Sequence, residues 1–567
     1  MGTTFRHRAS GGVSCQAGRL EVGGGSERTG GAVFAVGIAG CRARYPLGTE
    51  PEINNPAAPN KDAPMIQIDG RSLTLEDLEA VVDGLGGTVT LTDDARQAVR
   101  RSRATVEELV EAGEVVYGVT TGFGRLAEVS VSAGDRKTLQ VNLLRSHAAG
   151  TGPLLSVREV RTLLLLRANA LALGHSGCRL EVVECLLAFL DKRIHPAVPE
   201  AGSVGASGDL APLAHLALPL IGEGEVLDEE GGGVRPARKA LDDAGLEPLS
   251  LVAKEGLALI NGTQATTGLG ALALLRVERA LEQLEVAGAM TLEALKGTPE
   301  AFRAEVHEAR PHPGQVKSAQ VLRGLLAESE IRESHRHGDP RVQDAYSLRC
   351  MPQIHGAARS GLGYVREILG REVNAATDNP LVFPESRSVV SAGNFHAQVV
   401  AQALDLLCIV VADLASVSER RLERLLNPDL SGLPAFLAPE PGIHSGYMIL
   451  QVTVVDLLSE LRILASPASV DSVPTSAGQE DHVSMGMAAA RKARRAVTLL
   501  ETVVAAELLA AAQGLEYRLP LRGGVGVDAA YRKIREDVPP LAEDRSPAAE
   551  LRRVAQGVRE GAFIWDG

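Results

Sequence analysis

Aromatic side chains are scarce in this sequence, where phenylalanine, tyrosine and tryptophan together make up only 3% of 567 residues. Hydrophobic residues still account for 45% of the chain, so the core must consist largely of leucine, alanine and valine. Such side chains suit the packing of helix on helix, and a chain of this length can bury a large core. We therefore expect a globular protein made mainly of helices.

The sequence also lacks a disulfide framework and a membrane span. Its six cysteines are scattered, none belongs to a Cys-x-x-Cys pair, and a chain of this size does not need disulfides to fold. Reduced thiols predict a cytoplasmic protein. No uninterrupted apolar run approaches the roughly 20 residues that cross a membrane, so we expect a soluble protein with no membrane partner.

Several kinds of ligand are disfavoured. The formal net charge of −13 argues against nucleic acids and anionic membranes as partners. His335 and His337 lie in a charged loop without nearby cysteines or matching acidic residues, so we expect no metal site. Residues 122–127 formally fit a dinucleotide fingerprint, but no helix follows them and no repeated strand–helix units surround them. We therefore expect no nucleotide site.

Residues 1–64 are rich in glycine, arginine, serine and proline and show no sustained periodicity, which predicts a disordered N-terminal extension. A targeting segment, or a start assigned too early, stays open for this stretch. The rest divides into an N-terminal part that carries the loop discussed below (65–260), a central bundle of long helices (261–515) and a helical C-terminal tail (516–567).

Apolar residues three and four positions apart predict the helices. Shorter helices are expected at 75–85, 157–173, 180–190 and 548–558. Three stretches are unusually long: 264–295, 396–426 and 483–509. At a rise of about 1.5 Å per residue, each extends about 40 Å or more. Short β-like patches at 115–119 and 128–131 are minor. The expected fold class is all-α, a bundle of long helices with minor β patches in the N-terminal part.

Residues 202–212 read Gly-Ser-Val-Gly-Ala-Ser-Gly-Asp-Leu-Ala-Pro and contain the small residues Ala206, Ser207 and Gly208 in a row. In a tightly held loop, the amide nitrogen of Gly208 can approach the carbonyl carbon of Ala206. A side chain at position 208 would block that approach and the unusual backbone angles it needs. Ring closure with loss of water, including the Ser207 hydroxyl, would leave a methylene group conjugated to an imidazolone. That group is a strong electrophile.

A glycine-rich turn that begins a helix, with Ser207 or Asp209 as its cap, is the commonest origin of such a short motif. A serine nucleophile elbow would need Gly-x-Ser-x-Gly, and here glycine follows Ser207 directly. A phosphate-binding loop would need a Gly-Lys-Ser or Gly-Lys-Thr ending, which the motif lacks. The turn and the electrophile are the two interpretations left.

The longer string from Gly202 to His215 resembles the signature of the aromatic amino acid ammonia-lyases over fourteen contiguous positions. In that family the Ala-Ser-Gly triad becomes a methylidene-imidazolone prosthetic group. The resemblance therefore implies this group, formed from Ala206, Ser207 and Gly208, and no dissociable cofactor. It runs from about Met65 to the C-terminal end, and implies an all-α fold and a homotetramer whose active sites combine loops from different subunits.

Residues 117–124 resemble the family's mobile loop, in which Tyr117 matches the catalytic tyrosine. A phenol ordinarily titrates near pH ~10, so this role needs nearby positive potential, which helix N-termini could supply. Without the resemblance, Tyr117 would be interpreted as a turn residue packed on a core.

Three further blocks resemble family motifs and contain candidate substrate-binding residues. Arg349 matches the arginine that holds the substrate carboxylate, a role that suits its planar fork. Gln343 and Tyr346 match residues that line the substrate and the prosthetic group. Asn261 matches an asparagine beside that group, and Phe395 matches a residue that flanks the substrate ring. Taken singly, such residues are more often a surface charge, a helix cap or core packing.

Two positions bear on the identity of the amino acid substrate. His147, in Ser-His-Ala-Ala-Gly, resembles the histidine-specific version of the family, although tyrosine-specific relatives can also carry histidine there. Glu480 lies in Gln-Glu-Asp-His-Val-Ser-Met, which resembles the histidine-specific branch, whereas phenylalanine and tyrosine relatives generally carry glutamine. A carboxylate can accept an imidazole N–H or move a proton, and an amide cannot act as a base.

The resemblance implies a carbon–nitrogen lyase that eliminates ammonia from L-histidine to give trans-urocanate, the first step of histidine degradation. Either Tyr117 or Glu480 takes the β-proton, and this choice stays open. The alternatives are a tyrosine ammonia-lyase or tyrosine 2,3-aminomutase with the same electrophile, and a non-catalytic helical scaffold. Fumarase-like helical lyases are disfavoured because the sequence lacks their Gly-Ser-Ser-x-Met-Pro-x-Lys loop.

Overall fold

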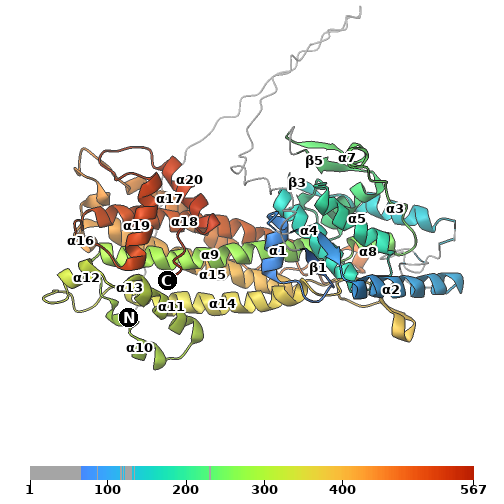
Figure 1. Cartoon of the computed structure of the whole chain (residues 1–567), viewed down its shortest axis with the longest axis horizontal. Coiled ribbons are helices and arrows are strands. Elements are labelled where there is room, and N and C mark those ends of the chain that lie inside the picture. Colours follow the sequence, from blue (N-terminus) through green and yellow to red (C-terminus); the bar gives the residue numbers. More distant parts are fainter. Residues whose placement is uncertain are drawn as a thin grey trace, which may run out of the picture. The chain divides into compact units, whose positions relative to one another are not determined.

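Long helices dominate the structure (Figure 1). The computed structural model describes residues 65–567 apart from 86, 115, 117, 119–120, 122–130, 133 and 229–231. The described residues all lie in one unit, Asn55–Gly567. The predicted all-α class is confirmed. The predicted extension 1–64 lies outside the described residues, and the segment boundaries at 260 and 515 remain predictions.

Four long helices lie side by side in the middle of this unit (Figure 1). They are α9 (Gln264–Ala294), α14 (Met351–Glu372), α15 (Gln398–Leu426) and α18 (Gly486–Glu516). Helices α9, α15 and α18 confirm the three long helices predicted from the sequence, and α18 continues beyond its predicted end at 509. The apolar spacing does not predict α14.

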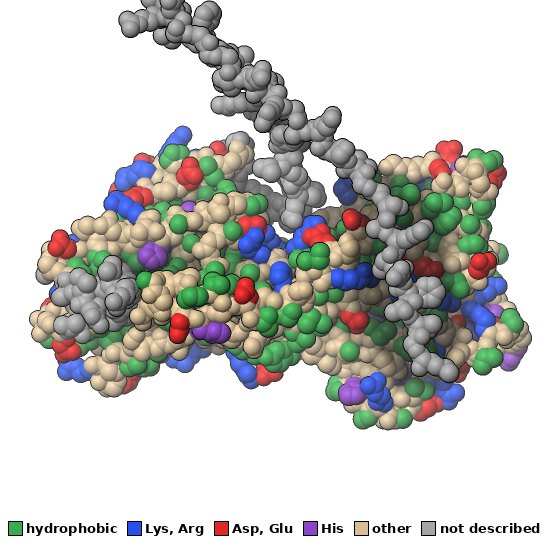
Figure 2. Space-filling view, turned by 180° about the vertical axis from the view of Figure 1, so that it is seen from behind, with side chains coloured by type: hydrophobic (Ala, Val, Ile, Leu, Met, Phe, Trp, Pro, Cys, Tyr) green, Lys and Arg blue, Asp and Glu red, His purple; other side chains and the backbone are tan. Residues whose placement is uncertain are grey.

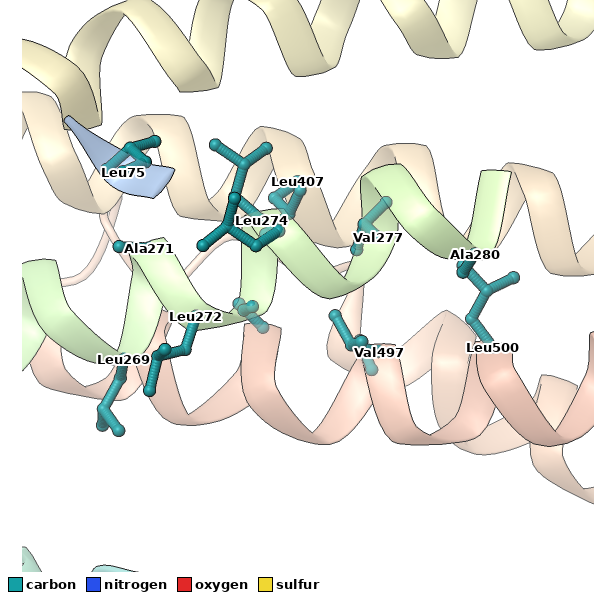
Figure 3. Close-up of a cluster of buried hydrophobic side chains, with 14 of the residues drawn as sticks. Leu75, Leu269, Ala271, Leu272, Leu274, Val277, Ala280, Leu407, Val497 and Leu500 are labelled. Atoms are coloured by element: carbon teal, nitrogen blue, oxygen red, sulfur yellow. The ribbon is translucent and has the colours of Figure 1, made fainter. Parts of the chain in front are cut away.

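Small and branched aliphatic side chains fill the space between these helices. Val277 and Ala280 of α9 lie next to Val497 and Leu500 of α18, and all four are fully buried (Figure 3). Alanine lets two helix backbones approach closely, and the larger aliphatic chains then fill the remaining gaps. The core therefore packs densely with few of the aromatic rings that are scarce in the sequence.

By length and composition alone, α15 and α18 are apolar enough to cross a membrane. In the structure, 61% of the apolar window of α15 and 89% of that of α18 are buried against other parts of the chain. A helix that is hydrophobic on most of its faces is also typical of the core of a large protein. The burial of these two helices identifies them as core helices of the bundle.

Shorter helices gather at the two ends of the long ones (Figure 1). One group comprises α1 (Leu75–Val82), α2 (Asp93–Glu111), α3 (Arg136–His147), α4 (Val157–Ala172), α5 (Leu180–Asp191), α6 (Leu210–Ala217), α7 (Ala237–Ala244) and α8 (Glu255–Ile260). The other comprises α10 (Ala304–Glu308), α11 (Pro313–Leu325), α12 (Glu330–Ser334), α13 (Tyr346–Arg349), α16 (Pro428–Ser431), α17 (Met448–Leu464), α19 (Val525–Asp537) and α20 (Ala548–Glu560). The predicted ranges of α1, α4, α5 and α20 are confirmed to within about three residues, the usual uncertainty of helix ends.

The described residues contain four small two-stranded sheets. The first is parallel, and the other three are antiparallel. Their strands are β1 (Ile66–Ile68) with β2 (Val89–Leu91), β3 (Thr151–Leu154) with β4 (Pro199–Ala201), β5 (Glu225–Leu227) with β6 (Val234–Pro236), and β7 (Leu381–Phe383) with β8 (Ser388–Val390). The predicted β patches at 115–119 and 128–131 lie mostly outside the described residues. The β7–β8 hairpin, beyond the N-terminal part, is not predicted by the sequence.

A buried ion pair joins α15 to α18 inside the bundle. The Arg421 guanidinium donates to both carboxylate oxygens of Glu507 at 2.5 and 2.8 Å, and both side chains are 0% exposed. Ser418 and Thr291 donate two more hydrogen bonds to the same carboxylate, at 2.5 and 2.9 Å. Glu507 is therefore satisfied only while its partners from α9 and α15 stay in register.

Replacing Arg421 with methionine is expected to lower the free energy of unfolding by about 3–5 kcal/mol, because it leaves the Glu507 charge buried and uncompensated. The shift of the urea unfolding midpoint measures this. Arg371→Met is the matched control: its ion pair with Glu367 lies on the surface and should contribute less than about 0.5 kcal/mol. Equal shifts for the two variants would show that the buried ion pair stabilises the fold no more than the surface pair does.

Candidate active site

The predicted triad lies in the loop between β4 and α6. Gly208 has a φ of +76° and pairs with Gly262 in a short parallel bridge. The Asp209 amide donates to the Gly262 carbonyl oxygen at 2.7 Å. A Cβ on Gly208 would lie only 2.3 Å from that oxygen. Only glycine fits this close backbone contact. The sequence predicts glycine at this position for a related reason, since a side chain there would block the approach of the amide nitrogen to Ala206.

Asp209 ties the end of this loop to the start of α9. Its fully buried carboxylate accepts hydrogen bonds from the Thr266 amide at 2.7 Å and the Thr266 hydroxyl at 2.8 Å. Burial raises the pKa of Asp209 to about 6, although these hydrogen bonds favour the charged carboxylate and oppose the shift. Asp209 is the N-cap of α6 by position, but its side chain makes no capping bond there. The interpretation of the motif as a simple capped turn is therefore wrong for Asp209.

The other side of the loop is held by the segment that precedes α18. The Met485 amide donates to the Val204 carbonyl at 2.9 Å, and the Ser484 hydroxyl donates to the Gly205 carbonyl at 3.4 Å. Two helices that are remote in sequence, α9 and α18, thus fix opposite ends of the same short loop. A loop held in this way meets the condition that a cyclisation of Ala206 with Gly208 would need.

Glu480 lies at Ser207, and His147 lies close enough to Glu480 for their charges to interact. The Ser207 hydroxyl lies 3.4 Å from Glu480 Oε1, although the two residues are 273 positions apart in sequence. His147, at the C-terminal end of α3, is half-buried; burial lowers its pKa, although the nearby Glu480 carboxylate opposes that shift. His147 Nδ1 lies 2.9 Å from the Leu143 carbonyl oxygen, which can only accept, so Nδ1 carries the proton and Nε2 presents a lone pair.

Asn261 lies in the turn between α8 and α9 and is 2% exposed. Its Nδ2 donates to the Asn379 carbonyl at 2.8 Å, while its Oδ1 has no hydrogen-bond partner among the described residues. Arg167 of α4 donates to the Asn261 carbonyl at 3.2 Å and to Gln264 Oε1 at 2.8 Å. Asn261 is not the N-cap of α9, because Thr263 occupies that position. Its side chain is instead held in place by the hydrogen bond to Asn379.

Phe395 lies at the edge of the same region. The next residue, His396, approaches the His482 carbonyl through Nε2 at 3.4 Å, and the two imidazole rings are stacked 5.9 Å apart. His482 follows Glu480 by two positions, so Phe395 lies near the glutamate loop. Phe395 itself is half-buried, and the helix predicted from 396 begins at Gln398.

Gln343, Tyr346 and Arg349 lie at the opposite end of α9 from Asn261. Thr298 donates its amide to Asp344 at 2.7 Å, which fixes the segment 341–344 just beyond the C-terminal end of that helix. The 31 residues of α9 span about 45 Å. Figure 1 shows α13 at one end of the long helices and α8 at the other. One chain therefore does not bring these three residues to its own Ser207.

Two of these three residues are accessible in the single chain, and Arg349 is half-buried. Gln343 is exposed, and Tyr346 is 70% exposed. The Arg349 guanidinium stacks on the Tyr346 ring at 4.6 Å, and its Nε has no hydrogen-bond partner among the described residues. Tyr117, the remaining predicted site residue, lies outside the described residues.

Sequence reasoning missed two residues that hold this site. Arg167 is a lone charge in the apolar part of α4, and an unpaired cation in such a run indicates a buried partner. Asn379 accepts from Asn261 through its carbonyl oxygen, a contact that no residue type specifies. The first could have been found from the sequence, and the second could not.

Comparison with known proteins agrees with this geometry. Residues 73–536 match the family model for aromatic amino acid lyases. The chain belongs to this family. A histidine ammonia-lyase from Anaeromyxobacter dehalogenans is 55% identical over 502 residues, which cover 88% of this chain and 99% of that protein. A histidine ammonia-lyase from Myxococcus xanthus is 51% identical over 501 residues, covering 88% and 98%.

Solved structures of family members share the fold of this lyase. The crystal structure of histidine ammonia-lyase from Trypanosoma cruzi is 42% identical with a TM-score of 0.82, covering 88% of this chain and 94% of that one. A tyrosine aminomutase from Streptomyces globisporus is 39% identical with a TM-score of 0.83, covering 88% and 98%. Since the two superpose equally well, the fold does not decide the substrate. That decision rests on side chains in the site.

Proposed function

We propose that this lyase eliminates ammonia from L-histidine to give trans-urocanate. The observation that carries the proposal is the Glu480 carboxylate beside Ser207, with His147 close enough to interact with that carboxylate electrostatically. The substrate imidazole has an N–H group that a carboxylate or a ring nitrogen can accept, and a phenyl ring has none. A carboxylate buried against a plain phenyl ring would be costly, since nothing would pair it. The name of the 55% identical relative agrees with this substrate.

We also propose that Ala206, Ser207 and Gly208 form a methylidene-imidazolone. The close contact of Gly208 with Gly262, which leaves no room for a Cβ, fits the cyclised triad. The group supplies an electron-poor carbon that activates the substrate α-amino group as a leaving group. The buried Asn261 side chain and the backbone of Gly262 would hold the ring from the side of α9.

The residues of the chain itself then bind the substrate and move its protons. Neutral His147 offers Nε2 to the imidazole, because its pKa is lowered and its Nδ1 proton is engaged by Leu143. Glu480 is the alternative acceptor of the imidazole N–H or the base that removes the β-proton, and Tyr117 is the other candidate base. Arg349 would grip the substrate carboxylate through its two parallel N–H groups.

The proposal requires a second copy of the chain, because Arg349, Gln343 and Tyr346 lie at the far end of α9 from Asn261, and that helix is about 45 Å long. A homotetramer with shared sites is the arrangement we propose. Apolar side chains exposed along α17 support it: Ile449 is 63% exposed, Val452 58% and Ile463 73%. Figure 2 shows hydrophobic side chains exposed across one face. Such surface is typical of faces that pack against another subunit.

The identity of the product tests the substrate directly. Purified protein incubated separately with L-histidine, L-tyrosine and L-phenylalanine should release ammonia and urocanate from histidine, with little product from the other two. Coumarate, or a β-amino acid formed from tyrosine, would instead identify the chain as a tyrosine ammonia-lyase or aminomutase.

Replacing Glu480 with glutamine is expected to lower kcat for histidine by about 100- to 10,000-fold, because an amide cannot accept the proton that the carboxylate accepts. Steady-state release of urocanate measures this. The matched control is Glu181→Gln, an exposed position on α5 that should leave kcat unchanged. A Glu480→Gln protein with wild-type kcat would remove this residue from the mechanism.

A further inference from the structure

Glu480 lies on a sharp turn that it closes together with Thr475. The Thr475 amide donates to the Glu480 carbonyl at 2.9 Å, and the Glu480 amide donates back at 3.4 Å. Between them the turn Ser476–Gly478 has positive φ at each residue, 47° at Ser476, 55° at Ala477 and 85° at Gly478. A non-glycine residue adopts such angles only where its surroundings enforce them. The surroundings therefore impose the conformation of the turn that leads into Glu480.

The two oxygens of the Glu480 carboxylate have different surroundings. Oε2 accepts a short hydrogen bond of 2.6 Å from the Thr475 hydroxyl, and Oε1 lies 3.4 Å from the Ser207 hydroxyl. We propose that Thr475 is a positioning residue, whose hydroxyl holds Oε2 so that Oε1 is directed at the reacting centre. The proposal rests on the proposed function, in which Glu480 contacts the substrate.

A glutamate needs such a partner in order to present one oxygen reproducibly. The terminal torsion of glutamate is broad and nearly two-fold, and its side chain has much rotamer freedom to lose. A threonine hydroxyl has a single proton to donate, so this hydrogen bond uses its whole donor capacity. Bonds from hydroxyl groups to carboxylates at this distance are among the strong ones.

The rest of the loop is anchored independently of the Thr475 hydroxyl. Asp405 of α15 accepts the amides of Ala468 and Ser469 at 3.0 and 2.8 Å and the Lys492 ammonium at 2.6 Å. Removal of the Thr475 hydroxyl therefore leaves this anchor, and the backbone bridge to Glu480, in place. The expected effect is on the carboxylate and not on the fold.

The test compares Thr475→Val with Thr475→Ser. Valine has the shape of threonine without the donor, so kcat for histidine should fall about 10- to 100-fold while KM changes less than about threefold. Serine keeps the donor and should retain kcat to within about threefold.

Two controls separate positioning from structure. Thr502→Val removes a hydroxyl from a half-buried threonine of α18 that bonds only its own helix, at the Thr498 carbonyl, and should behave as wild type. Added to Glu480→Gln, the Thr475→Val change should lower kcat no further, since both act through one carboxylate. Intact mass shows whether the triad matures equally in every variant.

Wild-type kcat in Thr475→Val would overturn the proposal, as would equal losses in the valine and serine variants. A wild-type protein that releases no urocanate would instead overturn the proposed function. Crystal structures of wild type and Thr475→Val then decide the positioning proposal alone. It predicts a Glu480 carboxylate held at Thr475 in wild type and rotated or disordered in the variant, and an unchanged carboxylate contradicts it.

Discussion

Two separately inactive variants, Ser207→Ala and Arg349→Ala, are expected to restore activity to each other when they assemble together. Each alone should lose at least about 100-fold in kcat/KM, since one lacks the electrophile and the other the carboxylate grip. In a mixed oligomer, Ser207 of one chain can meet Arg349 of another. Random assembly in equal amounts leaves about a quarter of the shared sites with both residues intact. Two affinity tags isolate the mixed oligomers, and urocanate release measures recovery.

The matched control pairs Ser207→Ala with Glu480→Gln. These residues lie 3.4 Å apart in one chain, so no shared site can recover both. This pair should stay inactive when it is mixed in the same way. Equal recovery for both pairs, or none for Ser207→Ala with Arg349→Ala in oligomers of wild-type size, would contradict the shared site.

Alanine at position 208 is expected to abolish both the electrophile and the reaction. Its Cβ would lie 2.3 Å from the Gly262 carbonyl oxygen, and alanine also disfavours the φ of +76°. The amide nitrogen at 208 then cannot hold its approach to Ala206. Purified Gly208→Ala should keep the full translated mass and lose activity at least about a thousandfold.

The control for backbone strain is Gly245→Ala, at the end of α7. Gly245 has a similar φ of +68°, but a Cβ there meets no atom within 4 Å. This variant should mature its triad fully and keep wild-type activity. If Gly208→Ala also matured and remained active, the close contact with Gly262 would not be a requirement for cyclisation.

The fold could be predicted only where apolar spacing is regular. Helices α9, α15 and α18 follow from their long aliphatic stripes, but α14 does not, because four glycines and a proline interrupt its pattern. Its glycines serve tertiary contact: a Cβ on Gly356 would lie 2.4 Å from the Gln315 amide nitrogen of α11. Close packing of two helix backbones depends on scattered glycines and does not produce a regular apolar repeat in the sequence.

The site could be predicted where a motif carries the chemistry. The triad, Glu480 and His147 follow from their local strings, and the structure places them together in one chain. Their convergence across hundreds of residues is a property of the packing of α3, α9 and α18. The importance of Thr475 escapes prediction because it depends on a bridge across a strained turn rather than on residue type.

The mass of the wild-type peptide that contains residues 202–212 tests the central claim most directly. Cyclisation of Ala206 onto Gly208 removes one water molecule, and loss of the Ser207 hydroxyl removes another. The account predicts a peptide two water molecules lighter than its translated sequence, in protein that releases urocanate. A peptide of full translated mass from freshly made, folded and active protein would contradict it.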